Sequence, residues 1–411
     1  MKYSLKKRIA ASVLAAVTAL TAFSALPADA AAAKKPSVLV LGDSISAKYN
    51  LKDTDFGYSD YVAAYLQADD YRNLAKSGLT STQLLDQLTN DAEKSGAVKN
   101  ADLVLVTIGS NDMLNALTAF LRANANEGER FRDYFLRVAK SGTKAVEAAA
   151  TKLTSALRTP RNTLDENMTA INARIHELNP DVRVVYQKIY NPFETDNAEY
   201  GGQSYAEYYE YFLNYIRGHI KRVNDNCFDD LKDAVITDPY TIFRDNAWKF
   251  TFSDKEDIHP NAYGHALMAA DTLNRLGYAD AVVPQFREVV LNAHKYLSTK
   301  TKFVPVSARE LLLPHTGISC THTLGDVDLD GQITPFDATV TLTSFNYFTV
   351  LGMDEDDPGL AGFVLNDEQH ITADADGDGR VDAYDATLIQ TYYTLKYMTG
   401  YDDLEWDELV R

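Results

Sequence analysis

The sequence predicts an α/β domain built on a parallel sheet that helices cover on both faces, followed by a second, smaller domain. Two observations predict the sheet. Short apolar runs alternate with longer segments of helical periodicity, and the first runs end abruptly at a glycine followed by polar residues. The second domain is indicated by two copies of one acidic motif, which begin at Asp326 and Asp374.

Four apolar runs have the length and composition of buried strands. They are Ser37–Leu41, Ala101–Ile108, Val182–Ile189 and the weaker Ala234–Thr237. The first two runs lead into the polar loops "GDSIS", which begins at Gly42, and "GSND", which begins at Gly109. Ligands of open parallel sheets bind outside the carboxyl ends of the strands, so we expect both loops at a ligand site.

The segments between these runs show helical spacing of apolar residues. The clearest predicted helices are Tyr61–Gln67, Ser81–Lys94 and Leu164–Leu178. The Ala-rich segment Leu114–Arg161 predicts two more helices. Because it leaves directly from the "GSND" loop, it either covers the ligand site or forms a solvent-facing insertion.

The first 30 residues are expected to be a signal peptide. A basic start precedes the apolar run Ile9–Leu26, and Ala28–Ala30 is a small-residue cleavage site. A transmembrane anchor is the alternative, but the cleavage site favours removal and a secreted, extracellular protein without a membrane anchor. We expect the sheet domain at 35–297, a linker at 298–323 and the second domain at 324–403. Cys227 and Cys320 either pair or stay reduced, since their spacing does not decide this.

The charge of the chain is concentrated near its C-terminus. The whole chain has 40 basic and 58 acidic residues, and 20 acidic but only 3 basic residues fall between Gly325 and Arg411. Such a block is either a solvated tail or a set of cation sites. A nucleic-acid-binding protein would carry a basic surface instead, so we expect no nucleic acid partner.

The two acidic motifs have the spacing of calcium loops. Each has acids at positions 1, 3 and 5, glycine at position 6 for the sharp turn, and aspartate at position 12. The predicted ligands are Asp326, Asp328, Asp330, the Gln332 carbonyl and Asp337 in the first loop, and Asp374, Asp376, Asp378, the Arg380 carbonyl and Asp385 in the second. We expect two Ca²⁺ ions and a domain that folds only with them, because converging carboxylates repel one another.

Duplicated calcium loops of this kind, each followed by one helix, resemble a dockerin domain. The resemblance covers Gly325 to about Tyr401. It implies a small all-α calcium-binding domain whose partner is a cohesin module of a cellulosome scaffold. In that family, loop positions 10 and 11 help to select the cohesin, and these positions hold Pro335, Phe336, Ala383 and Tyr384.

Polar residues in the predicted loops of the first domain suggest nucleophilic catalysis. Ser44 directly follows a buried strand, but the G-x-S-x-G elbow of α/β-hydrolases is absent. A serine nucleophile requires a base and donors for the oxyanion. Gly78 and Asn111 are candidate donors, and His259 is a candidate base. A metal site at His259 is weakly supported, since no ligand triad is evident, and His265 is expected to pack within a helix.

The order Ser44, Gly78, Asn111 and His259, in these contexts, resembles the SGNH (GDSL) hydrolases over roughly Lys35 to Gly277. The resemblance implies a three-layer flavodoxin-like fold. It also implies that Ser44 is the nucleophile and His259 the general base, and that Ser44 N–H, Gly78 N–H and Asn111 Nδ2 form the oxyanion hole. No cofactor is expected for catalysis.

The carboxylate that orients His259 is less clearly specified. The family places aspartate three residues before the histidine, where this chain has Glu256. Asp257 lies one residue later. We expect Glu256 to be the acid, with Asp257 as the second choice, because glutamate on the same turn is long enough to reach the imidazole.

These predictions describe a secreted, cellulosome-bound serine esterase that works through an acyl-enzyme. The dockerin resemblance suggests plant cell wall as the substrate, so the prediction is deacetylation of xylan or pectin. A lipase or lysophospholipase is the alternative, which a large apolar acyl pocket would favour. A non-catalytic wall-binding module delivered by the dockerin is the alternative from another class.

Overall fold

A computed structural model of the chain describes residues 35–409 except for 54, 193–198, 201–202, 205, 230, 245–246, 253–256, 279–280, 292–305 and 378–379. The predicted signal peptide, residues 1–30, lies outside the described residues. Among the helices that are described, none is both long enough and apolar enough to span a bilayer.

Five parallel strands form one sheet in the order β2-β1-β3-β4-β7. They are β1 (Ser37–Gly42), β2 (Asp70–Asn73), β3 (Leu103–Thr107), β4 (Arg183–Gln187) and β7 (Ala234–Thr237). The four predicted strands are confirmed. The sequence did not indicate β2, because this edge strand reads "DYRN" and all four of its residues are exposed. A separate two-stranded ribbon joins β5 (Glu199–Tyr200) to β6 (Gln203–Ser204).

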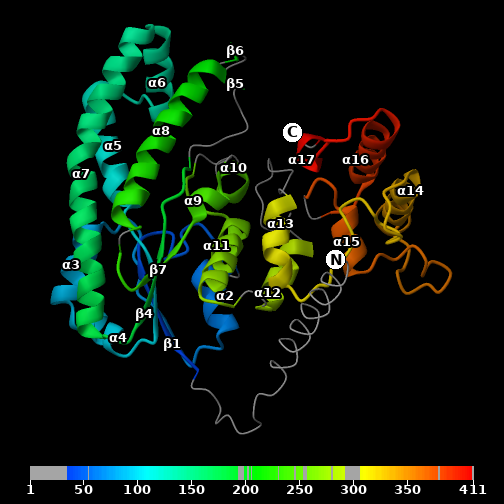
Figure 1. Ribbon diagram of the computed structural model, residues 1–411, viewed down its shortest axis with the longest axis horizontal. Helices are drawn as coiled ribbons and strands as arrows, with labels where there is room; N and C mark the ends of the chain where they lie inside the picture. The colour runs from blue at the N-terminus through cyan, green and yellow to red at the C-terminus, as the bar shows by residue number, and fades with distance from the viewer. Residues whose placement is uncertain are drawn as a thin grey trace, which may run out of the picture. The chain divides into compact units, whose positions relative to one another are not determined.

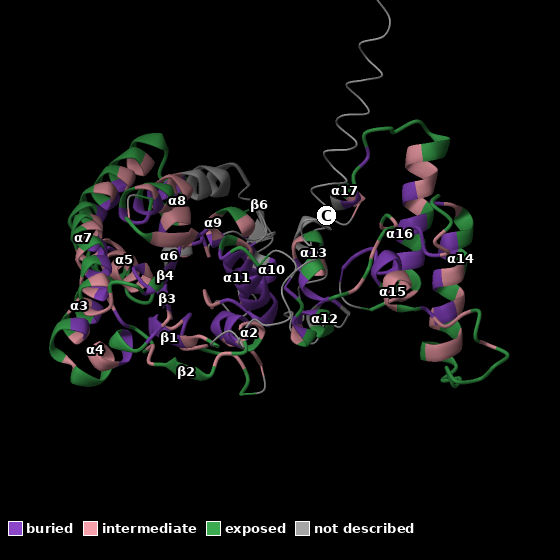
Figure 2. Ribbon diagram, turned by 60° about the horizontal axis from the view of Figure 1, so that its bottom comes forward, coloured by how far each residue is buried: buried purple, intermediate pink, exposed green. Residues whose placement is uncertain are grey.

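Helices cover both faces of the sheet (Figure 1). On one face, Val38 and Val40 of β1 belong to a buried cluster with side chains of α2 (Tyr58–Tyr65), α11 (Ala262–Arg275) and α12 (Pro284–Leu291). On the other face, Leu39 and Leu41 pack in a cluster with α3 (Ser81–Asn90), α4 (Ala92–Lys99), α7 (Thr143–Leu178) and α8 (Ala206–Cys227). The continuous apolar run of β1 is therefore explained by burial on both sides. Figure 2 shows this buried central layer.

Part of the predicted linker is helical. Helix α13 (Val306–Leu312) and the 3₁₀ turn η3 (Leu313–His315) follow α12, and Leu312 is fully buried in the same cluster as α11. The short helices α9 (Pro239–Ile242) and α10 (Ala247–Phe250) precede α11. The predicted helix Ser81–Lys94 is divided in two, because the Asp91 carboxylate accepts the Glu93 N–H at 2.9 Å and caps a new helix.

A helical insertion follows β3. It comprises α5 (Ser110–Asn124), α6 (Phe131–Lys140) and the first half of α7, three helical segments where the sequence predicted two. Phe120, Tyr134, Val138, Leu153 and Leu157 form a small buried core within it. The insertion therefore has a small hydrophobic core of its own.

The second domain is all-α, as predicted. Its helices are α14 (Pro335–Ser344), α15 (Asp367–Ala373), α16 (Ala383–Tyr393) and α17 (Trp406–Leu409), and the π-helical turns η4 (Phe345–Val350) and η5 (Thr394–Met398) extend α14 and α16. A separate buried cluster includes Val327, Ile389 and Trp406. Trp406 stacks on Tyr392 with ring centroids 4.1 Å apart.

Candidate active site

The loop after β1 places Ser44 at the carboxyl edge of the sheet. Gly42 has a φ of +117°, and a Cβ there would come within 1.9 Å of the Thr107 carbonyl oxygen of the neighbouring strand, so this turn requires glycine. The adjacent Asp43 is fully buried and accepts hydrogen bonds from Thr107 Oγ1 at 2.7 Å and Ile45 N–H at 3.1 Å. Burial raises the pKa of Asp43 to about 7. This polar network fixes the backbone that presents Ser44.

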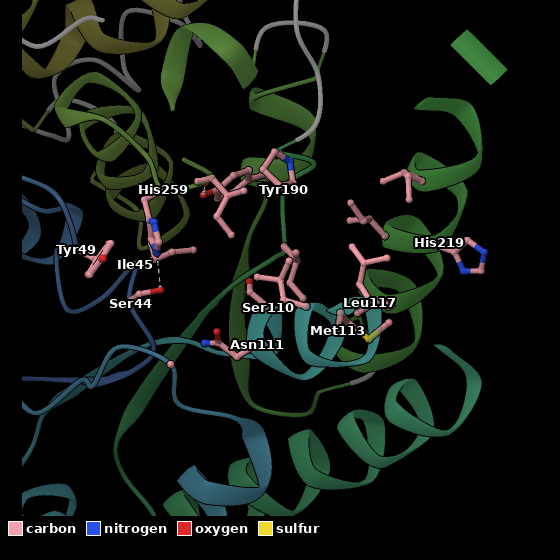
Figure 3. A pocket seen from close by; sticks show the side chains of 18 of the residues that line it. Ser44, Ile45, Tyr49, Ser110, Asn111, Met113, Leu117, Tyr190, His219 and His259 are labelled. Carbon is pink, nitrogen blue, oxygen red and sulfur yellow. Dashed lines mark hydrogen bonds between the residues drawn. The ribbon is translucent and has the colours of Figure 1, made fainter. Parts of the chain in front are cut away.

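Ser44, His259 and Asp257 form a hydrogen-bonded chain. Ser44 Oγ lies 2.8 Å from His259 Nε2, and His259 Nδ1 lies 2.5 Å from Asp257 Oδ1 (Figure 3 draws the first contact). The same carboxylate oxygen accepts the His259 backbone N–H at 3.0 Å. In this arrangement Nδ1 donates to the carboxylate, and Nε2 accepts the serine proton.

Two further contacts hold the His259 loop. Tyr190 Oη donates to the Ile258 carbonyl oxygen at 2.5 Å. Asn50 Nδ2 donates to Asp257 Oδ2, which is the carboxylate oxygen that faces away from His259. Burial alone would raise the pKa of Asp257, but the hydrogen bonds from His259 and Asn50 outweigh it and hold that pKa below its ordinary value. The carboxylate is therefore ionised when the histidine accepts a proton.

The structure brings Asp257, the second choice of the sequence analysis, into contact with His259. Glu256, the first choice, lies outside the described residues. His265 is buried in α11, and its Nδ1 accepts the Tyr58 N–H at 3.2 Å. Burial lowers the pKa of His265 to about 3, so it is a neutral packing residue, as expected.

The other two candidate donors lie on separate segments. Gly78 has a φ of +80°, and the space that a Cβ would occupy there is open, so a ligand can approach its backbone. Asn111, in the first turn of α5, donates one amide hydrogen from Nδ2 to the Leu79 carbonyl at 3.0 Å. The second hydrogen of that amide is available to a ligand. Both residues line the same cavity as Ser44 and His259.

That cavity has a volume of about 330 Å³. Met113, Leu114 and Leu117 of α5, Leu157 of α7, and Ile216 and Ile220 of α8 form much of its wall. Figure 3 shows Ser44 and His259 at one end and Leu117 and His219 at the other. Burial lowers the pKa of His219 to about 4, so this wall residue is neutral. The helical insertion therefore lines the site instead of facing only solvent, and sequence periodicity gave no sign of the cavity.

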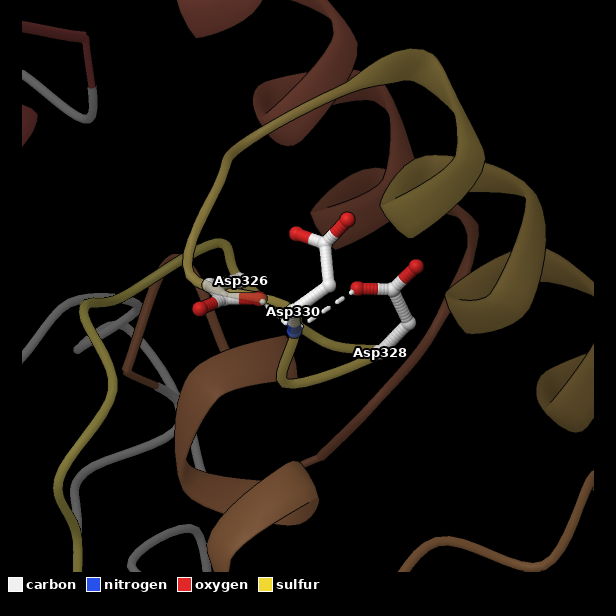
Figure 4. Close-up of side chains that lie close together, drawn as sticks. All are labelled: Asp326, Asp328 and Asp330. Atoms are coloured by element: carbon white, nitrogen blue, oxygen red, sulfur yellow. Dashed lines mark hydrogen bonds between the residues drawn. The ribbon is translucent and has the colours of Figure 1, made fainter.

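The first predicted calcium loop brings its acids together. Carboxylate oxygens of Asp326, Asp328 and Asp330 lie within 4.8 Å of one another (Figure 4). Asp326 also accepts the N–H groups of Asp330 at 3.1 Å and Gly331 at 2.9 Å, which closes the turn. Asp337 is buried beside the loop, where it accepts the Val327 N–H at 2.7 Å. These oxygens suit a hard cation such as Ca²⁺.

In the second loop, Asp374, Asp376 and Asp385 converge in the same way and are all buried. Asp378 lies outside the described residues. Burial and the neighbouring Asp374 and Asp376 carboxylates raise the pKa of Asp385 well above its ordinary value. A cation bound between these three carboxylates would compensate their charge. The structure does not assign ligand roles to the Gln332 and Arg380 carbonyls, which remain predictions.

The four residues predicted to contact a cohesin are all exposed at the starts of α14 and α16. Phe336 is 59% exposed and Tyr384 is 50% exposed. Pro335 and Ala383 stand beside them as the first residues of the two helices. The duplicated motifs therefore place one exposed aromatic ring at the start of each helix.

Comparison with known proteins gives matches to both domains. Residues 40–267 match the GDSL-like Lipase/Acylhydrolase family, and residues 324–393 match the Dockerin type I domain. The uncharacterised protein YpmR of Bacillus subtilis (strain 168) is 25% identical over 241 residues, which is 56% of this chain and 78% of that protein.

Two solved structures of lipases are among the matches. An extracellular lipase from Streptomyces rimosus is 22% identical, covering 59% of this chain and 99% of its own with a TM-score of 0.41. The lipase Lip_vut3 from a goat rumen metagenome is 19% identical. The match covers 59% of this chain and 98% of that lipase, with a TM-score of 0.39.

Proposed function

Because the chain belongs to the GDSL-like lipase/acylhydrolase family, and is thus an ester-hydrolysing serine hydrolase, we propose that Ser44, His259 and Asp257 are its catalytic triad. The hydrogen-bonded order from Ser44 Oγ through His259 to Asp257 supports this assignment. The Asp257 carboxylate holds the imidazole in the tautomer that accepts the serine proton, and it stabilises the imidazolium that results.

The reaction follows from these positions. Ser44 Oγ attacks the ester carbonyl carbon while its proton passes to His259 Nε2. The carbonyl oxygen becomes an oxyanion, which the N–H groups of Ser44 and Gly78 and the free amide hydrogen of Asn111 stabilise. His259 then gives the proton to the leaving alcohol, and the acyl group stays on Ser44. Water, activated by His259, releases the acid and regenerates the enzyme.

We propose that the acyl group is apolar and longer than acetyl. The observation that carries this proposal is the cavity of about 330 Å³, which begins at Ser44 and is walled by leucine, isoleucine and methionine side chains. An acetyl group would leave most of this surface uncovered, whereas a longer acyl chain would remove it from water.

A series of p-nitrophenyl esters tests the acyl proposal. We expect kcat/KM to rise from acetate through butyrate to octanoate, because burying each methylene is worth about 0.8 kcal/mol, or about fourfold in rate constant. Leu117→Phe should reduce the octanoate value more than the acetate value, since it fills the far end of the cavity shown in Figure 3. A series in which acetate is the best substrate would contradict the proposal.

Deacetylation of xylan or pectin is the second candidate. It is favoured by the type I dockerin domain, since a dockerin binds a cohesin partner and places an enzyme on a cellulosome. We infer that the protein is secreted through its first 30 residues and bound to a cellulosome through its second domain. Release of acetate from acetylated xylan and pectin, measured beside the p-nitrophenyl series, distinguishes the two candidates. Labelling of Ser44 by a fluorophosphonate would exclude the non-catalytic module.

Type I dockerin domains bind calcium, and we propose that this one binds two ions. The two converging aspartate groups support that number. Chelation with EDTA is expected to reduce the helical circular dichroism of the full chain and to abolish one melting transition, because the loop carboxylates lose their counter-charge. Titration calorimetry should return two sites, and Asp326→Ala should remove one.

Activity on a soluble ester is the control for the calcium experiment. We expect it to survive chelation, since the proposed triad uses no cofactor. An unchanged dichroism spectrum and an unchanged melting curve after chelation would contradict the calcium proposal without affecting the catalytic one.

A further inference from the structure

The two oxyanion donors outside the nucleophile come from different segments of the chain. Gly78 lies in the loop before α3, and Asn111 lies in the first turn of α5. Their separation therefore depends on how the beginnings of α3 and α5 are held together. The Asn111 amide makes one such contact, to the Leu79 carbonyl at 3.0 Å.

Asp112 makes a second and stronger contact between the same two helix ends. Its carboxylate accepts the Ser81 backbone N–H at 2.9 Å to Oδ2 and 3.2 Å to Oδ1, and its Oδ1 accepts the Ser81 hydroxyl at 2.6 Å. Thr80 caps α3 by accepting the Gln83 N–H, which leaves the Ser81 N–H without a partner inside its own helix. The Asp112 carboxylate satisfies that donor from the neighbouring helix.

The surroundings make this contact rigid. Ser81 is fully buried, so its N–H cannot exchange the carboxylate for water. The positive end of the α3 dipole also favours a negative group at this point. Burial raises the pKa of Asp112, and the hydrogen bonds from Ser81 oppose that rise. From the opposite side, Asn167 of α7 donates to the Ser81 hydroxyl oxygen at 2.9 Å.

We propose that Asp112 is a positioning residue that fixes the distance between the Gly78 and Asn111 donors by joining the first turn of α3 to the first turn of α5. The inference rests on the proposed oxyanion roles of those two residues. Asp112 touches neither the substrate nor the reacting atoms. It acts only on the distance between the Gly78 and Asn111 donors, and so on how well both can hydrogen-bond to the developing oxyanion.

A boronic acid inhibitor tests this role, because it forms a tetrahedral adduct with the serine that mimics the charged intermediate. We expect Asp112→Asn to lower kcat by ten- to a hundredfold with little change in KM, and to raise the boronate inhibition constant by a similar factor. The asparagine amide fits the same space, but it has no charge and a single acceptor oxygen for the Ser81 N–H and hydroxyl, which now share two carboxylate oxygens. Asp112→Glu, which keeps the acceptor, should recover part of both losses.

Asn167→Ala is the control, since it removes hydrogen bonds to Ser81 and Thr82 in the first turn of α3 without removing a contact to α5. We expect it to lower the melting temperature but to leave boronate affinity unchanged. The inference is overturned if Asp112→Asn leaves boronate affinity unchanged, or if Asn167→Ala weakens it equally. If the wild-type protein binds no boronate, or binds it equally well after Ser44→Ala, the proposed function fails instead.

Discussion

Asp257→Asn is expected to lower kcat by about three to four orders of magnitude, with little change in KM, because the carboxylate that sets the His259 tautomer is lost. The Asp257 carboxylate accepts three hydrogen bonds: from the His259 ring, from the His259 backbone N–H, and from Asn50. An asparagine amide offers one oxygen and one NH₂ group to these donors. If its oxygen faces His259, its nitrogen opposes the Asn50 amide. If the amide has the opposite orientation, its NH₂ group faces the ring N–H and the backbone N–H of His259, which are also donors.

Glu256→Gln is the matched substitution for this experiment. It removes a carboxylate from the adjacent position, and we expect kcat to change less than about threefold, a difference of under 1 kcal/mol in the barrier. Initial rates on p-nitrophenyl butyrate give kcat and KM for both variants, and melting curves check that both are folded. Loss of activity in Glu256→Gln with retention in Asp257→Asn would reassign the acid to Glu256.

The choice between these two acids shows where sequence spacing stops being informative. Spacing alone leaves both residues as candidates: Glu256 stands where the family has aspartate, and Asp257 is one residue later. What favours Asp257 is its hydrogen bond to the His259 ring, and the Asn50 amide, from the loop that follows the nucleophile, holds the other carboxylate oxygen. A single sequence carries no sign of such a contact.

The fold was largely predictable because burial on both faces of β1, β3 and β4 produces continuous apolar runs. Strand β2 was missed for the opposite reason: it lies at the edge of the sheet and its residues are polar and exposed. Helix α13 was missed because its seven residues make only two turns, too few for a helical period to be recognised in the sequence. Periodicity detects long elements whose burial is regular, and it fails for short helices and exposed edge strands.

The candidate site, like the fold, has residues that the sequence predicted and a feature that it did not. Ser44, Gly78, Asn111 and His259 could be named as candidates because each stands in a polar stretch beside a predicted strand or helix, where such residues are unusual for packing alone. The cavity was not predictable, since much of its wall comes from α5 and α7 of the insertion and from α8, and their apolar residues resemble ordinary core residues in the sequence. The shape left between packed helices depends on tertiary structure, and it is this shape that favours an apolar acyl group over acetyl.

Asn111→Ala is expected to lower kcat by about 10²–10³ with little effect on KM, as the loss of one oxyanion donor does elsewhere. The donor acts mainly on the charged intermediate, so substrate binding should be nearly unchanged. Asn111→Asp should be the more damaging variant, because it replaces the free amide hydrogen with a negative charge facing the oxyanion and also opposes the Leu79 carbonyl, which now accepts from Asn111 at 3.0 Å. The rate of fluorophosphonate labelling at Ser44 should also fall in Asn111→Ala and fall further in Asn111→Asp. The reason is that this reaction also develops charge on an oxygen that the same donors bind. If both variants retained the wild-type kcat and labelling rate, Asn111 would be excluded from the oxyanion hole, and its bond to Leu79 would be its whole role.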